Sequence, residues 1–218
     1  MNVSSRLSRR NLLKWTGAAG TIAVAGSLLP NFGISAALGA ELGDGDIGVL
    51  NYAYALEQLE AAFYTQVLDT PFGEMQVNDQ RILTQIRDHE IAHRDFLKKA
   101  LGGNAIPGLE VDFSAVDFSS RRSVLTTADV FENLGVAAYN GAGQLISNPD
   151  YLVAAGSIVS IEARHAAAIA DLLKPFSAEA AGRGNVDHQG LDGALLPSEV
   201  LKAAAPFIAT PVTAATLP

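Results

Sequence analysis

A repeated pair of short motifs most constrains how this chain can fold: Glu90-Ile91-Ala92-His93 and Glu162-Ala163-Arg164-His165. Each motif lies in a segment whose apolar residues recur at steps of three and four, which is typical of one helix face. Residues three apart on a helix point the same way, so the Glu and the His can reach one metal ion. A helical segment with a Glu on its apolar face precedes each motif, at Glu57 and at Glu132.

Apolar periodicity predicts four long helices after residue 44. Start and stop signals, such as Asn148-Pro149-Asp150 and Thr70-Pro71-Phe72-Gly73, set their approximate bounds. The expected helices are Asp46–Leu68, Asn78–Leu101, Thr126 or Thr127 to Ile146, and Asn148–Leu173. The links within the first pair and within the last pair are short, whereas 102–125 is too long for a turn. The chain is therefore expected to be all-α, with two antiparallel hairpins joined by a long crossover.

The two halves of this predicted bundle resemble each other. Glu57 precedes Tyr64 by the same number of residues as Glu132 precedes Tyr139. This spacing indicates a degenerate internal repeat of one helical hairpin. Tyr64 and Tyr139 are expected to fill the core beside the Glu and His residues, where each hydroxyl can hydrogen-bond a carboxylate.

The candidate ligands together form a set suited to two metal ions. They are Glu57, Glu90, His93, Glu132, Glu162 and His165. Their four carboxylates would balance two divalent cations, and an unpaired buried carboxylate costs several kcal/mol. Carboxylate and imidazole suit Fe or Mn, and also Zn, whereas the absence of cysteine excludes thiolate sites. Glu90 and Glu162 are the expected bridges between the two ions.

Three residues near the motifs have competing interpretations. Glu60 competes with Glu57 as the ligand of the first helix, and it is otherwise expected to contact a ligand or to lie on the helix surface. His89 completes the sequence His89-Glu90-Ile91-Ala92-His93, which is also the zinc-protease pattern. That interpretation leaves the second Glu-x-x-His unexplained, so His89 is expected behind the ligands or at the surface. His188 is expected to be a solvated loop residue.

The segments outside the helices carry weaker patterns. The crossover contains a short repeat, Val111-Asp112-Phe113-Ser114 and Val116-Asp117-Phe118-Ser119. This repeat predicts an extended chain that packs two Phe rings on the bundle. Residues 176–218 are rich in Gly, Pro and Ala and are expected to form an irregular C-terminal extension. Within it, Pro197-Ser198-Glu199 is typical of the start of a short helix.

Residues 1–40 have the features of a targeting segment. Ser8-Arg9-Arg10-Asn11-Leu12-Leu13-Lys14 resembles a twin-arginine export signal, and the apolar stretch Trp15–Pro30 follows it. Small residues at Ser35–Ala40 offer a peptidase site. An uncleaved anchor is the alternative, but the stretch is short and rich in glycine. We therefore expect export to the periplasm or beyond, no stable membrane span after cleavage, and a bundle at residues 44–175.

The charge of the chain restricts its partners. The net charge is −8, and the first 40 residues hold four basic and no acidic side chains, so the rest carries −12. Such an acidic protein is a poor candidate for binding nucleic acid or an anionic membrane. A small-molecule oxidant or a metal ion is the expected partner, and a homo-oligomer is compatible with the sequence.

Together the motifs resemble one bacterial family. Leu56-Glu57-Gln58-Leu59-Glu60-Ala61-Ala62-Phe63-Tyr64, the His89–Leu97 run and Ile161–His165 are similar to the exported ferritin-like domain proteins of desiccation-related type. The similarity covers about residues 46–175. It implies a ferritin-like four-helix bundle with a di-iron or di-manganese site.

The same resemblance leaves the activity open. It implies chemistry on peroxide, dioxygen or ferrous ion, of the peroxidase, catalase, ferroxidase or hydroxylase type. The alternative is a stress or envelope protein that binds metal only to stabilise its fold. Iron storage is a third interpretation, and it requires assembly into a cage.

Overall fold

The computed structural model describes residues 39–182 and 184–218. Residues 1–38, which hold most of the predicted export signal, lie outside the described residues. The bundle consists of α2 (Gly45–Asp69), α3 (Val77–Leu101), α4 (Arg121–Gly143) and α5 (Pro149–Leu173). The predicted all-α four-helix architecture is thereby confirmed.

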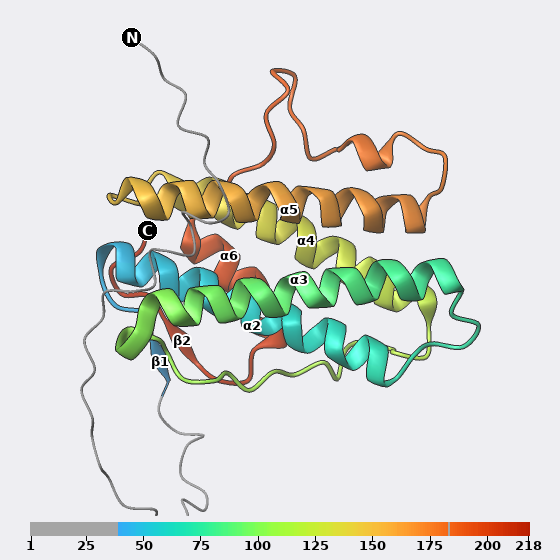
Figure 1. The fold of residues 1–218 in the computed structure, drawn as a ribbon, viewed down its shortest axis with the longest axis horizontal. Helices are drawn as coiled ribbons and strands as arrows, with labels where there is room; N and C mark the ends of the chain where they lie inside the picture. Colours follow the sequence, from blue (N-terminus) through green and yellow to red (C-terminus); the bar gives the residue numbers. More distant parts are fainter. Residues whose placement is uncertain (1–38, 183) are drawn as a thin grey trace, which may run out of the picture. The chain divides into compact units, whose positions relative to one another are not determined.

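The four helices form a closed ring around one core. The closest packing is within the pairs α2–α3 and α4–α5, which are the two predicted hairpins. The pairs α2–α4 and α3–α5 also touch, and these contacts join the hairpins to each other. Figure 1 shows the four long helices running alongside one another. Each helix therefore turns one face toward a shared interior.

The helix ends show how local sequence sets these bounds. Helix α5 begins where expected, because the Asn148 side chain accepts the Asp150 amide N–H at 2.9 Å. The start predicted for α4 at Thr126 or Thr127 is wrong. The Ser120 hydroxyl caps this helix instead, so it begins at Arg121 and ends at Gly143 rather than Ile146.

The crossover covers one side of the bundle with aromatic rings. Phe113 and Phe118 pack against Phe63 of α2, with ring centroids 5.7 and 5.9 Å away. The predicted packing of both Phe residues is therefore correct. The prediction of extended chain is only partly correct. Asp112 and Asp117 each accept the amide N–H two residues on, which bends the backbone into turns.

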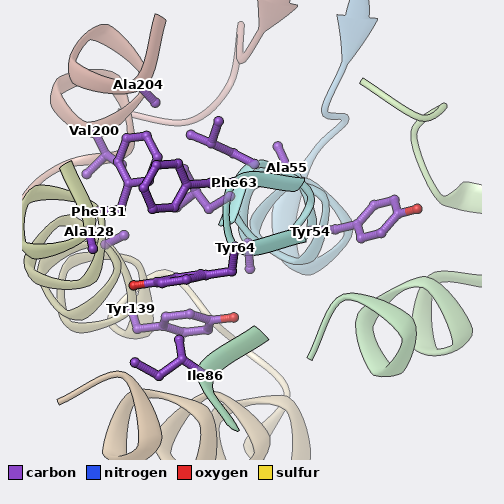
Figure 2. Packing of buried hydrophobic residues seen from close by; sticks show 14 of the residues in the cluster. Tyr54, Ala55, Phe63, Tyr64, Ile86, Ala128, Phe131, Tyr139, Val200 and Ala204 are labelled. Carbon is purple, nitrogen blue, oxygen red and sulfur yellow. The ribbon is translucent and has the colours of Figure 1, made fainter. Parts of the chain in front are cut away.

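The C-terminal extension is built into the fold. Its short helix α6 (Pro197–Ala204) begins at the predicted position and packs on α4. Val200 of α6 is fully buried and lies near Phe131 of α4 (Figure 2). Beyond it, β2 (Val212–Thr213) pairs in parallel with β1 (Ala40–Glu41). The last of the small residues expected at the peptidase site, Ala40, is therefore part of a strand.

Short 3-10 helices connect these elements. They are η3 (Gly102–Asn104), η4 (Glu179–Ala181) and η5 (Ala205–Phe207). In Figure 1 the orange segment that contains η4 folds back along the outside of α5. Among the described helices, α5 is the one that is long and apolar enough to cross a membrane by length and composition. A bundle helix passes the same test, and α5 packs on α4 and α3 here.

Candidate metal centre

All six predicted ligands meet inside the bundle, and each of the four helices contributes one or two of them. Helix α2 carries Glu57, α3 carries Glu90 and His93, α4 carries Glu132, and α5 carries Glu162 and His165. The four carboxylates have no solvent exposure. Their ligand atoms form two overlapping groups whose members lie within 4.8 Å of one another. Glu90 and Glu162 belong to both groups, as expected of bridging residues.

The first group surrounds the Nδ1 atom of His93. This atom lies 3.1 Å from Glu162 Oε1 and 3.4 Å from both Glu57 Oε2 and Glu90 Oε2. Despite these distances, His93 Nδ1 makes no aligned hydrogen bond. Three carboxylate oxygens from three helices therefore converge with the imidazole on one point. Such convergence is the arrangement that a metal ion with nitrogen and oxygen ligands requires.

The second group surrounds the Nδ1 atom of His165 in the same way. The distances are 2.8 Å to Glu90 Oε1, 3.3 Å to Glu132 Oε2 and 4.0 Å to Glu162 Oε2. Each imidazole thus faces both Glu-x-x-His carboxylates and the single Glu of its own hairpin. The internal repeat that the sequence indicates is reproduced in space as two similar half-sites.

The pattern of unpaired atoms fits a bound cation. Buried polar atoms without a hydrogen-bond partner are rare in proteins, because each costs about 1–3 kcal/mol. In the described residues, all such side-chain atoms except the Tyr52 hydroxyl belong to the six predicted ligands. They are oxygens of the four carboxylates and the two imidazole Nδ1 atoms. Two divalent cations would satisfy all of them at once.

The two tyrosines bind carboxylates across the bundle. The Tyr139 hydroxyl on α4 donates a hydrogen bond of 2.5 Å to Glu57 Oε1 on α2. The Tyr64 hydroxyl on α2 donates to Glu132 Oε1 on α4. Figure 2 shows the two side chains extending in opposite directions, with their hydroxyls at opposite ends. Each Tyr leaves the second oxygen of its Glu free for a metal.

Burial and charge shift the pKa values of the cluster in opposite directions. Burial raises the pKa of Glu57 to about 7, although His93 counteracts it. Burial, and then the charge of Glu90, raise the pKa of Glu162 well above its ordinary value. Burial lowers the pKa of His93, but the carboxylates of Glu162, Glu57 and Glu90 outweigh burial and raise it to about 12. Without metal the cluster therefore retains protons, which metal binding would release.

His89 occupies the position behind one of the imidazoles. Its Nδ1 lies 2.9 Å from Nε2 of His165, on the side of the ring away from the carboxylates, and the rings stack 5.1 Å apart. Gln85 contacts its other nitrogen at 3.1 Å. His89 is absent from both ligand groups, so the geometry does not match a zinc-protease site at this motif. His188 is exposed, as expected.

Among the site residues, Glu60 is the one whose position the sequence predicts least well. Its side chain is 3 % exposed, which rules out a helix-surface position. It shares the interior with the ligand carboxylates, although Glu57 rather than Glu60 belongs to the ligand groups. The signal that could have placed it is the glycine opposite, Gly135, which lies on the inward stripe of α4 and leaves room there.

The family comparison covers the whole bundle. The sequence model of the ferritin-like domain family matches residues 45–175, from the first residue of α2 to just beyond α5. This is more than half of the chain and includes every predicted ligand. No curated protein matches the chain.

Proposed function

The chain belongs to the ferritin-like domain family, and we propose that its bundle holds two divalent metal ions, iron or manganese, for redox chemistry. The oxidant or substrate is a small species: peroxide, dioxygen or ferrous ion. The observation that carries this proposal is the set of buried carboxylate and imidazole atoms that lack any other partner. A bound iron or manganese pair would supply the electrons that such a reaction exchanges.

The residues divide the work around that pair. His93 would hold one ion together with Glu57, and His165 would hold the other together with Glu132. Glu90 and Glu162 would bind both ions. The Tyr64 and Tyr139 hydroxyls, which donate to Glu132 and Glu57, would orient these two carboxylates toward the ions.

The burial of the site supports a small reactant. An apolar cavity of about 20 Å³ lies next to Tyr139, lined also by Leu56, Leu97 and Ile158. A water molecule needs roughly 10–15 Å³ measured this way, so the cavity accommodates one or two atoms beyond hydrogen. Dioxygen and peroxide are of this size, so either would fit beside Tyr139.

The proposed location is outside the cytoplasm. It rests on the twin-arginine-like segment of residues 1–40, since proteins with such signals are exported folded and can carry a metal acquired beforehand. The acidic net charge of −8 agrees with a partner that is a cation or a small molecule rather than nucleic acid.

Metal analysis tests the proposal most directly. Protein matured in a host with twin-arginine export is expected to contain about two equivalents of Fe and Mn combined, and chelator should lower its Tm. Glu162→Ala, which removes a shared ligand, should lose most of both metals. Less than about 0.2 equivalents of Fe, Mn and Zn combined, with a Tm indifferent to chelator, would contradict the proposal.

The burial of the four carboxylates also favours a second candidate function, in which the metals only stabilise the fold. Because the four ligand carboxylates have no solvent exposure, the metals could serve only to hold a stress or envelope protein together. That function shares the metal content and the loss of stability in Glu162→Ala, but it predicts no turnover. Stopped-flow assays with hydrogen peroxide and with ferrous ion plus dioxygen therefore separate the two candidates.

A further inference from the structure

One position breaks the symmetry of the two half-sites. The repeat that relates Glu57 to Glu132 and Tyr64 to Tyr139 relates Glu60 to Gly135. The first hairpin thus contributes a carboxylate at a position where the second contributes no side chain. Both positions lie on the inward faces of their helices, α2 and α4.

Gly135 provides the space that the Glu60 carboxylate uses. A Cβ atom at Gly135 would lie 3.3 Å from Glu60 Oε1 and also 3.3 Å from Glu162 Oε2. Both oxygens therefore border the same small volume beside α4. The Glu60 carboxylate extends from α2 into the volume beside α4 that Glu162 of α5 also borders.

Burial makes this arrangement costly unless a cation is close. Glu60 is 3 % exposed, and burial and then the charge of Glu162 raise its pKa well above the ordinary value. The charges of Glu90, Glu132 and Glu57 act in the same direction. A buried carboxylate close to other carboxylates is stabilised by a proton or by a nearby cation.

We propose that Glu60 is a fifth carboxylate ligand of the metal pair and makes the two metal positions unequal. This inference rests on the proposed function. Its chemical consequence follows from charge: four carboxylates balance two divalent ions, whereas a fifth balances a pair in which one ion is trivalent. Glu60 would therefore favour the oxidised state of the position that it borders, and the other position would keep the more open coordination.

Metal titration of Glu60→Gln tests the proposal, with Glu110→Gln as the matched control because Glu110 is exposed. Mn²⁺ titrated into the metal-free proteins should show two binding steps in the wild type. Glu60→Gln should weaken one step by about 10–100-fold and change the other by less than about 3-fold. The same variant should have a higher Tm than wild type without metal, because a buried carboxylate is removed.

If Glu60 only stabilised the fold, Glu60→Gln would not both weaken metal binding and raise the Tm of the metal-free protein. Two unchanged binding steps in Glu60→Gln, or two tighter ones, would overturn the inference while leaving the proposed function intact. Failure of the wild type to bind Mn²⁺ or Fe²⁺ at all would overturn both.

A swapped variant provides a second, independent measurement. Glu60→Gly combined with Gly135→Glu moves the fifth carboxylate to α4, beside the space released by Glu60, and Glu162 Oε2, 3.3 Å from the new Cβ, must shift slightly. Relative to Glu60→Gly alone, the swap should restore the weakened step to within about tenfold of wild type. If the swap folds but restores no affinity, a carboxylate in this volume is not a ligand.

Discussion

The Tyr139 hydroxyl lies 2.5 Å from Glu57 Oε1, and this hydrogen bond runs from the second hairpin to a ligand of the first. Tyr64 makes the reciprocal bond from the first hairpin to Glu132 of the second. Each half-site therefore depends on the other hairpin for the orientation of its single Glu. The two proposed metal positions would be coupled through these bonds as well as through Glu90 and Glu162, which belong to both ligand groups.

Replacing either Tyr with Phe should weaken the centre without removing a ligand. In Tyr139→Phe, Glu57 Oε1 loses its donor while buried, which costs about 1–3 kcal/mol. We expect the Tm of the metal-loaded protein to fall by about 2–8 °C. Tyr52→Phe on the same helix as Glu57 is the matched control, because the Tyr52 hydroxyl is buried without a hydrogen-bond partner. Its Tm should stay unchanged or rise.

His89 should matter for metal affinity although it is not a predicted ligand. It contacts Nε2 of His165 and so fixes the ring whose Nδ1 faces the carboxylates. Removing the outer partner of a metal-binding His typically costs about 10–100-fold in affinity. We expect the metal affinity of His89→Ala, measured by competition with a chelator, to fall by that factor, mainly in one of the two metal-binding steps. His188→Ala, in the exposed tail, should show no change.

The opposite result would be equally informative. If His89→Ala abolished binding of one metal altogether, His89 would have to be a ligand itself, and the ring of His165 would have to turn. Equal losses in the His89 and His188 variants would indicate that the stacked ring has no influence on the centre.

Much of the centre could be predicted from the sequence, because helical periodicity fixes which residues share a face. Glu90 and His93 face inward together for this reason, and the repeat predicts the partner pair at Glu162. Glu60 could not be placed in this way. Helical spacing leaves Glu57 and Glu60 on nearly the same face, and only the space beside Gly135 on another helix decides where the second carboxylate goes.

Errors in the predicted fold have a similar origin. The start of α4 is ambiguous in the sequence because Ser120, Thr126 and Thr127 are all suitable caps, and nothing local distinguishes them. In the structure Ser120 caps the helix, whereas the Thr127 hydroxyl donates to the carbonyl of Ser123 inside it. Choices among equivalent local signals depend on tertiary packing.

An ion pair at one end of the bundle should make stability depend on acid. Arg121 Nε and Nη2 donate to both oxygens of Asp79 at 2.9 Å, and Nη2 also donates to the Leu172 carbonyl at 3.1 Å. One guanidinium thus joins α3, α4 and α5. The hydrogen bonds from Arg121 hold the pKa of Asp79 below its ordinary 3.8, although burial opposes them.

The sign of the pH dependence follows from that lowered pKa. Asp79 stabilises the fold fully above pH 3.8 and loses this contribution as the pH falls through its lower folded value. Because the Arg121 side chain is 40 % exposed, solvent screening limits the pair to about 1 kcal/mol. Urea unfolding should find Asp79→Asn less stable than wild type by about this amount at pH 6. The gap should narrow as the pH falls below 3.8; a constant gap would exclude the ion pair as its cause.

Gly141 on α4 allows the contribution of the C-terminal extension to stability to be measured. A Cβ at Gly141 on α4 would lie 1.8 Å from the Leu195 carbonyl oxygen, and the Leu195 amide donates to Ala137 at 3.0 Å. The extension therefore passes directly over the backbone of α4 on its way to α6. Gly141→Ala cannot be accommodated unless the extension or the helix moves.

We expect Gly141→Ala to lower the free energy of unfolding by about 2 kcal/mol or more, because backbone cannot yield as a side chain does. Gly156→Ala is the matched control, since a Cβ there meets nothing within 4 Å on the exposed face of α5. Alanine has the higher helix propensity, so that control should gain about 0.5–1 kcal/mol. Limited proteolysis should cut Gly141→Ala between Lys174 and Lys202 faster than the control. If both variants gained stability and resisted protease alike, the extension would contribute little to the bundle that holds the metal centre.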